Sequence, residues 1–125
     1  MTGWASFFVS GSAKMKESAV SEFINVCSVE DLVSGAGVAA LVNEQQIALF
    51  YIGGNVYALD NFEPIGEAFV LSRGMTGDAG GELFVASPLH KERFSLLSGE
   101  CLDCDGVSVA VYPSKIEDGQ VWISA

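Results

Sequence analysis

Short runs of apolar and β-branched residues, separated by glycine-containing turns, are the feature that most constrains the fold of this chain. Gly53-Gly54 separates two such runs, and Asp118-Gly119 separates two more near the C-terminus. Both patterns are typical of tight β-hairpin turns. We predict strands over residues 23–26, 38–42, 46–52, 55–59, 69–71, 83–86, 93–96, 107–111, 115–116 and 121–123. With no amphipathic helix of useful length, the pattern predicts an all-β sandwich or barrel.

Two segments between these runs do not have a strand pattern. Ser28 can cap a helix whose first turn includes Asp31, so we predict one helical turn that ends at Gly35 or Gly37. Residues 75–81 are glycine-rich and are predicted to form a loop between two strands.

The chain has 125 residues, half of them hydrophobic, which is enough for one domain with its own core. We assign residues 21–125 to this domain and residues 1–20 to an N-terminal extension, in which Met15 is an alternative start. The apolar stretch at residues 4–9 follows no Lys or Arg and is broken by Gly11 and Ser12. We therefore expect neither a membrane span nor a signal peptide.

The formal net charge is −10, from 16 acidic and 6 basic residues. Nucleic-acid binding requires clustered Lys and Arg, so no nucleic-acid partner is expected. An anionic membrane surface is disfavoured for the same reason. The charge either attracts a basic protein partner or only keeps the domain soluble.

The cysteines are Cys27, Cys101 and Cys104, an odd number that favours a reducing compartment over a disulfide framework. A zinc site at Cys101 and Cys104 would need a second spaced pair of ligands, which the sequence lacks. Acidic neighbours such as Asp103 would raise the thiol pKa, which is unlike a reactive dithiol. We interpret the pair as incidental, with a small metal or dithiol module as an alternative function.

Two loops that each carry a proline follow predicted strands, at residues 60–66 and 86–94. Their arrangement resembles the Rieske [2Fe–2S] domain, whose loops read Cys-Pro-His and Cys-Pro-x-His. The resemblance extends from about Phe23 onward. It implies a Rieske-type antiparallel β-sandwich with one short N-terminal helical turn.

On that pattern, Glu63 and Ile65 occupy the first cysteine and histidine positions, and Ser87 and His90 occupy the second pair. A Rieske cluster requires two thiolates on one iron and two imidazoles on the other. Of these four residues, only His90 can ligate iron in the expected way. We therefore expect no cluster, no other metal and no catalytic residue in this chain, and interpret His90 as a contact or packing residue.

Three motifs point to one particular family among the Rieske-type domains: Val-Leu-Ser-Arg-Gly at 70–74, Ser-Pro-Leu-His-Lys at 87–91, and Arg93-Phe94. They resemble the small subunit of assimilatory nitrite reductase [NAD(P)H], whose loops commonly lack cluster ligands. The resemblance implies a cytoplasmic accessory subunit. Its partner would be a large subunit that carries FAD, an iron–sulfur cluster and siroheme, and that reduces nitrite to ammonium with reduced nicotinamide.

In Rieske proteins the ligand loops face the redox partner. Arg73, His90, Lys91 and Arg93 concentrate positive charge near these loops in an otherwise acidic chain. We predict that they contact the large subunit, the alternative being that they are solvated loop charges. The main alternative function is a genuine Rieske ferredoxin or oxygenase component that carries electrons through its own cluster.

Overall fold

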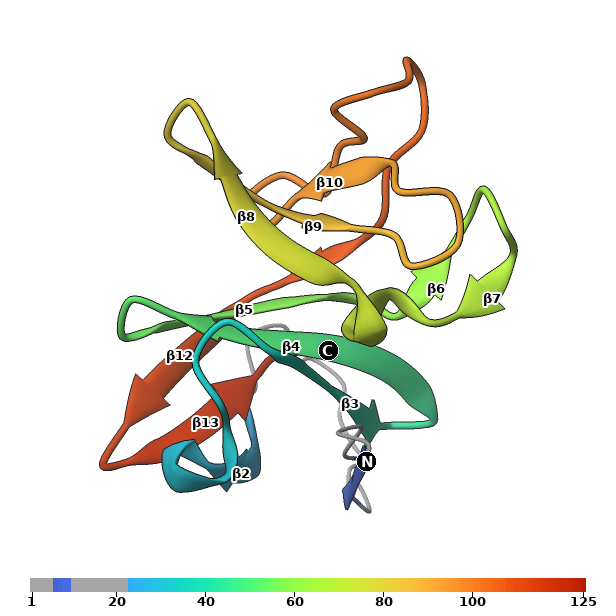
Figure 1. Ribbon diagram of the computed structural model, residues 1–125. Helices are drawn as coiled ribbons and strands as arrows, with labels where there is room; N and C mark the ends of the chain where they lie inside the picture. The colour runs from blue at the N-terminus through green and yellow to red at the C-terminus, as the bar shows by residue number, and fades with distance from the viewer. Residues whose placement is uncertain (1–5, 10–22) are drawn as a thin grey trace.

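A five-stranded sheet forms the middle layer of the fold, as Figure 1 shows. In spatial order its strands are β1 (Ser6–Val9), β3 (Gly37–Val42), β4 (Gln45–Ile52), β5 (Asn55–Asp60) and β11 (Val111–Tyr112). Neighbouring strands are antiparallel except β1 and β3, which are parallel. The structure is a computed structural model and describes residues 6–9 and 23–125.

Two three-stranded antiparallel sheets cover the faces of the central sheet (Figure 1). One contains β8 (Met75–Ala79), β9 (Glu82–Ala86) and β10 (Arg93–Ser95). The other contains β2 (Ile24–Ser28), β12 (Ser114–Glu117) and β13 (Gln120–Ile123). A short hairpin of β6 (Phe62–Glu63) and β7 (Ala68–Phe69) extends from the end of β5.

Strand β4 explains why the central sheet is covered on both sides. Successive side chains of a strand point to opposite faces, and residues 47–50 are all fully buried. Ile47 and Leu49 pack in one core with residues of β2 and β13, while Ala48 and Phe50 pack in a second core with residues of β9 and β10. Burying each large side chain contributes about 1.5–3 kcal/mol. The predicted all-β class is confirmed.

The predicted helical turn is present, but it is shorter than expected. It is the 3₁₀ turn η1 (Val29–Asp31), and Ser28 and Asp31 form a capping box at its start. The turn ends before Gly35 because Leu32 already has an extended backbone. The Gly35 amide then donates to the Tyr51 carbonyl of β4.

Three other element predictions are wrong in part. The glycine-rich segment predicted as a loop contains β8, which pairs with β9 along its whole length around a Gly80-Gly81 turn. Residues 69–71 end β7 and begin the 3₁₀ turn η2 (Leu71–Arg73). Within 107–111, only Val111 belongs to a strand, and Ser108 makes an isolated bridge with Glu100. At β8, pairing with β9 overrides the local pattern.

The predicted N-terminal extension lies largely outside the described residues. Its described part is β1, which adds a parallel strand at the edge of the central sheet beside β3. No helix within residues 6–9 and 23–125 has the length and apolar character needed to cross a membrane.

Candidate functional site

Two proline-containing loops meet at one end of the molecule. One joins β6 to β7 over residues 64–67, and the other joins β9 to β10 over residues 87–92. Figure 1 shows them next to each other beyond the end of the central sheet. A Cβ atom placed on Gly66 would lie 2.5 Å from Leu89 Cδ1, so the loops touch. We refer to them as the paired loops.

A carboxylate and a hydroxyl join the paired loops at their base. The side chains of Glu63 and Ser87 are buried, with residue exposures of 0% and 2%. Ser87 Oγ donates a hydrogen bond of 2.6 Å to Glu63 Oε2. The Ser87 oxygen in turn accepts from the Leu89 amide at 3.1 Å. Two of the four positions assigned to cluster ligands are therefore bonded to each other.

The other oxygen of Glu63 organises its own loop. Glu63 Oε1 accepts from the amides of Ile65 at 2.5 Å and Gly66 at 2.8 Å. Burial raises the pKa of Glu63, but the hydrogen bonds from Ser87, Gly66 and Ile65, together with the charge of nearby His90, outweigh it and lower the pKa below its ordinary value of 4.5. The carboxylate is therefore ionised at neutral pH although it is buried.

The remaining two predicted ligand positions face outward. Ile65 is 36% exposed and has no donor atom, and His90 is exposed on the other loop. Leu89, beside His90, is 46% exposed. The paired loops therefore present two apolar side chains and an imidazole to solvent.

The four residues predicted to contact a partner have different surroundings. Arg73, His90 and Lys91 are exposed. Arg93 instead forms a two-pronged ion pair with Asp103, with Nη2 2.7 Å from Oδ1 and Nε 3.1 Å from Oδ2. Its guanidinium also lies over the Phe84 ring, 5.4 Å from the ring centroid. Arg93 therefore has a structural role that its sequence position did not reveal.

Asn61 is a buried residue that sequence reasoning missed. Its side chain donates to Gln46 Oε1 at 3.1 Å and accepts from the Ser72 amide at 2.7 Å. Asn61 thus fixes the start of the β6–β7 hairpin to the central sheet and to η2. Its position just beyond the predicted strand 55–59, in Asp60-Asn61, is the only local signal of this role.

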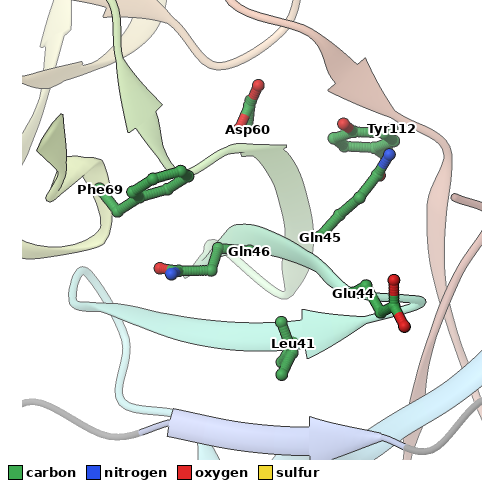
Figure 2. A pocket seen from close by; sticks show the side chains of 7 residues that line it. All are labelled: Leu41, Glu44, Gln45, Gln46, Asp60, Phe69 and Tyr112. Carbon is green, nitrogen blue, oxygen red and sulfur yellow. The ribbon is translucent and has the colours of Figure 1, made fainter. Parts of the chain in front are cut away.

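A hollow of about 280 Å³ lies beside the hairpin, lined by Leu41, Glu44, Gln45, Gln46, Asp60, Phe69 and Tyr112 (Figure 2). Phe69 packs edge-on against Phe62, with ring centroids 5.0 Å apart. Burial and the charge of Asp60 raise the pKa of Tyr112, which keeps its hydroxyl protonated at neutral pH. Asp60 also accepts from the Phe62 amide, so part of its role is to turn the chain into the hairpin.

The residues at the predicted ligand positions do not match a Rieske donor set. Glu63 and Ser87 could offer iron only oxygen ligands, and those oxygens are already engaged in hydrogen bonds. Ile65 has no atom that could bind a metal. Within residues 6–9 and 23–125, no three His, Cys, Asp or Glu side chains converge in a way that would hold a metal ion.

Comparison with known proteins identifies the family. Residues 22–124 match the Rieske-like [2Fe-2S] domain family. A nitrite reductase (NADH) small subunit from Salmonella typhimurium is 42% identical over 104 residues, which are 82% of this chain and 96% of that protein. The chain belongs to the nitrite reductase (NADH) small subunit family.

Two further relatives place this family member in context. The crystal structure of an NADH-dependent nitrite reductase small subunit from Mycobacterium tuberculosis has a TM-score of 0.81 at 38% identity, covering 85% of this chain and 96% of that one. A nitrite reductase [NAD(P)H] large subunit from Klebsiella oxytoca is 51% identical over 100 residues, 78% of this chain. This chain spans only 10% of that longer protein. The predicted Rieske-type fold and small-subunit family are confirmed.

Proposed function

We propose that this chain is a cytoplasmic accessory subunit that binds the nitrite reductase large subunit and supports it without a redox centre of its own. The nitrite-reducing chemistry would then take place on the large subunit, with the cofactors that the family resemblance assigns to it. The small subunit would contribute a contact surface and stability to the assembly.

The Glu63–Ser87 hydrogen bond is the observation that carries this proposal. In a Rieske domain, iron bound by residues of both loops connects them. In this chain a 2.6 Å hydrogen bond between two buried side chains connects the same loops. Such a bond to an ionised acceptor is short and comparatively strong, so the loops keep their arrangement without iron.

The exposed end of the paired loops is the surface proposed to contact the large subunit. It combines apolar Ile65 and Leu89 with His90 and Lys91. Apolar anchors surrounded by polar groups are typical of protein interfaces. Arg73, which is exposed at the end of η2, is assigned to this surface by its sequence position after the β6–β7 hairpin. Only the exposed edge of the Arg93 guanidinium is proposed to contact the large subunit, because Asp103 and Phe84 hold the rest of its side chain.

The Klebsiella oxytoca relative supports the choice of partner. There, a segment similar to most of this chain is part of a polypeptide named as the large subunit. Covalent fusion of two domains gives them a high effective concentration, which favours a functional contact between them. A separate small subunit would have to achieve the same contact by binding.

Co-expression tests the proposal. The full chain is produced with the large subunit of the same organism, captured by an affinity tag on the small subunit, and assayed for nitrite-dependent oxidation of NADH. We expect the two chains to co-purify, and the large subunit to lose activity or stability when this chain is omitted. Failure to associate, with identical nitrite reduction in both preparations, would contradict the proposal.

The Rieske-like [2Fe-2S] domain match favours a second candidate, a ferredoxin or oxygenase component that transfers electrons. That function requires a donor set that Glu63, Ile65 and Ser87 do not provide. Stoichiometric iron with a Rieske spectrum in the purified chain would establish this candidate instead.

A further inference from the structure

Cys101 and Cys104 are brought together in the segment that follows β10. The second of the paired loops comes before β10 in the sequence, so the two cysteines lie outside the paired loops. Their Sγ atoms lie 2.7 Å apart, and both residues are partly buried. Cys27 is buried in a different core, packed with β13. The two loop thiols are therefore separate from the third.

Backbone hydrogen bonds hold the first cysteine in place. The Cys101 amide donates to the Val107 carbonyl at 2.9 Å, and Cys101 forms an isolated bridge with Phe94. The next amide, of Leu102, donates to the Arg93 carbonyl at 2.7 Å. Residues 101–107 thus form a closed loop attached to β10.

Asp103 holds the segment between the two cysteines. Its carboxylate accepts from the Arg93 amide at 2.8 Å and from two guanidinium nitrogens of the same residue. These hydrogen bonds and the charge of Arg93 lower the pKa of Asp103 to about 2. The clamp persists over the physiological pH range and restricts how far Cys104 can move from Cys101.

We propose that Cys101 and Cys104 form a reversible thiol–disulfide site, oxidised by exchange with a low-molecular-weight disulfide such as oxidised glutathione. A disulfide bond of about 2.05 Å requires only a small further approach of the two sulfur atoms. This proposal is independent of the function assigned above, because the two thiols lie outside the paired loops.

The exchange balances in two steps. The thiolate of one cysteine attacks the reagent disulfide, forms a mixed disulfide and releases one reagent thiol. The second cysteine, as its thiolate, attacks the protein-side sulfur, closes the Cys101–Cys104 bond and releases the second reagent thiol. The protein loses two electrons and two protons, and the reagent disulfide is reduced to two thiols.

The surroundings of Cys104 determine the rate of this exchange through the pKa of its thiol. The hydrogen bond with Cys101, burial, and nearby negative charges that include Glu92 and Asp103 raise the pKa of Cys104 to about 11. Glu92 contributes a buried oxygen, Oε1, with no hydrogen-bond partner among the described residues. Because only the thiolate attacks, the site equilibrates slowly at neutral pH and faster as the pH rises. This behaviour suits a slowly responding site better than a fast oxidoreductase.

Glutathione redox buffers test the proposal on the full chain. The protein is equilibrated without oxygen at several ratios of oxidised to reduced glutathione, trapped by alkylation and measured by mass spectrometry. We expect a product that has lost two hydrogen atoms, carries no glutathione and is cross-linked between Cys101 and Cys104. Cys27 should remain a free thiol. C104S should instead keep a glutathione adduct on Cys101.

A comparison with unfolded protein separates a built site from two cysteines that are merely close in sequence. The equilibrium constant for forming the Cys101–Cys104 disulfide should be at least about tenfold larger in the native protein than in urea, because the fold raises the effective concentration of the two thiols. D103N should reduce this preference by about threefold in the native protein only, since it weakens the Arg93 clamp. No intramolecular disulfide under oxidising conditions, or equal closure in native and unfolded protein, would overturn the proposal.

Discussion

Ser87 donates a 2.6 Å hydrogen bond to the buried carboxylate of Glu63 and so joins two loops that are 24 residues apart in sequence. The same carboxylate accepts hydrogen bonds from two backbone amides of its own loop. The three donors explain how an ionised glutamate is accommodated where it is fully buried, because a buried charge is tolerated when hydrogen bonds replace its hydration. This arrangement leads to the first two predictions.

Replacing either member of the pair should destabilise the fold. S87A leaves Glu63 Oε2 buried without its donor, and E63Q directs an amide group at the Ser87 hydroxyl. Each change should lower the free energy of unfolding by about 1–3 kcal/mol. Urea denaturation monitored by tryptophan fluorescence measures this loss.

E67Q provides the matched control for the glutamate, because Glu67 is exposed on the same hairpin. Its stability should differ from the wild type by less than about 0.5 kcal/mol. The double variant E63Q/S87A should be less destabilised than the sum of the single variants. Full additivity would show that the two side chains do not interact.

The stability of the chain should depend on pH through Glu63. Its native pKa lies below its ordinary value of 4.5, so the stabilisation is fully present above that value and is lost as the pH falls through the native pKa. Asp103, with a pKa of about 2 against an ordinary 3.8, contributes in the same direction at lower pH. The free energy of unfolding, measured between pH 7 and about pH 3, should therefore change less with pH for E63Q than for the wild type. Identical pH profiles would show that the carboxylate is not stabilised in the native state.

Gly74 should not accept a larger side chain. A Cβ atom there would lie 2.2 Å from the Ala86 carbonyl oxygen and 2.7 Å from a methyl group of Val85. G74A should therefore cost about 1–3 kcal/mol through displacement of β9. G54A is a comparison at a position where a Cβ meets nothing within 4 Å, although its positive φ of 84° adds some backbone strain. Calorimetric unfolding should give a larger loss of stability for G74A than for G54A.

Charge placed on the paired loops should weaken association with the large subunit. L89E introduces a carboxylate at an exposed apolar position of the proposed contact surface, and it should raise the dissociation constant at least about tenfold. K91E should slow association, with an effect that shrinks at high salt. Titration calorimetry or surface plasmon resonance with the purified large subunit measures both.

V33E is the matched control for L89E, because Val33 is 66% exposed and lies in the loop before β3. It should leave the affinity unchanged. An equal loss for V33E and L89E, or no loss for either, would place the contact surface elsewhere on the chain.

The fold was largely predictable because its strongest signals are local. Gly53-Gly54 and Asp118-Gly119 form the hairpin turns that they predict, with positive φ at all four residues. Strand β8 was missed because Met75 to Ala79 includes Gly77 and Asp78, which are poor strand formers. Pairing with β9 decides its conformation, and that pairing is not visible in a local window.

The site was predictable only as a set of positions. The loop pattern drew attention to Glu63 and Ser87 as replacements for ligands, but their hydrogen bond depends on how two distant loops pack. Asn61 and the Arg93–Asp103 clamp were missed for the same reason. The close approach of Cys101 and Cys104 could be suspected from their spacing, yet the clamp that holds their loop comes from β10.

Iron content after anaerobic reconstitution tests the central claim most directly. The purified chain is incubated with ferrous iron, sulfide and a reductant, desalted, and measured for iron, acid-labile sulfide and the electron paramagnetic resonance spectrum of the reduced state. E63C/I65H/S87C, which restores the Rieske donor set around His90, is treated in parallel. We predict that the wild-type chain retains no stoichiometric iron and gives no Rieske signal. Two irons and two sulfides per wild-type chain, with a Rieske spectrum, would contradict the account.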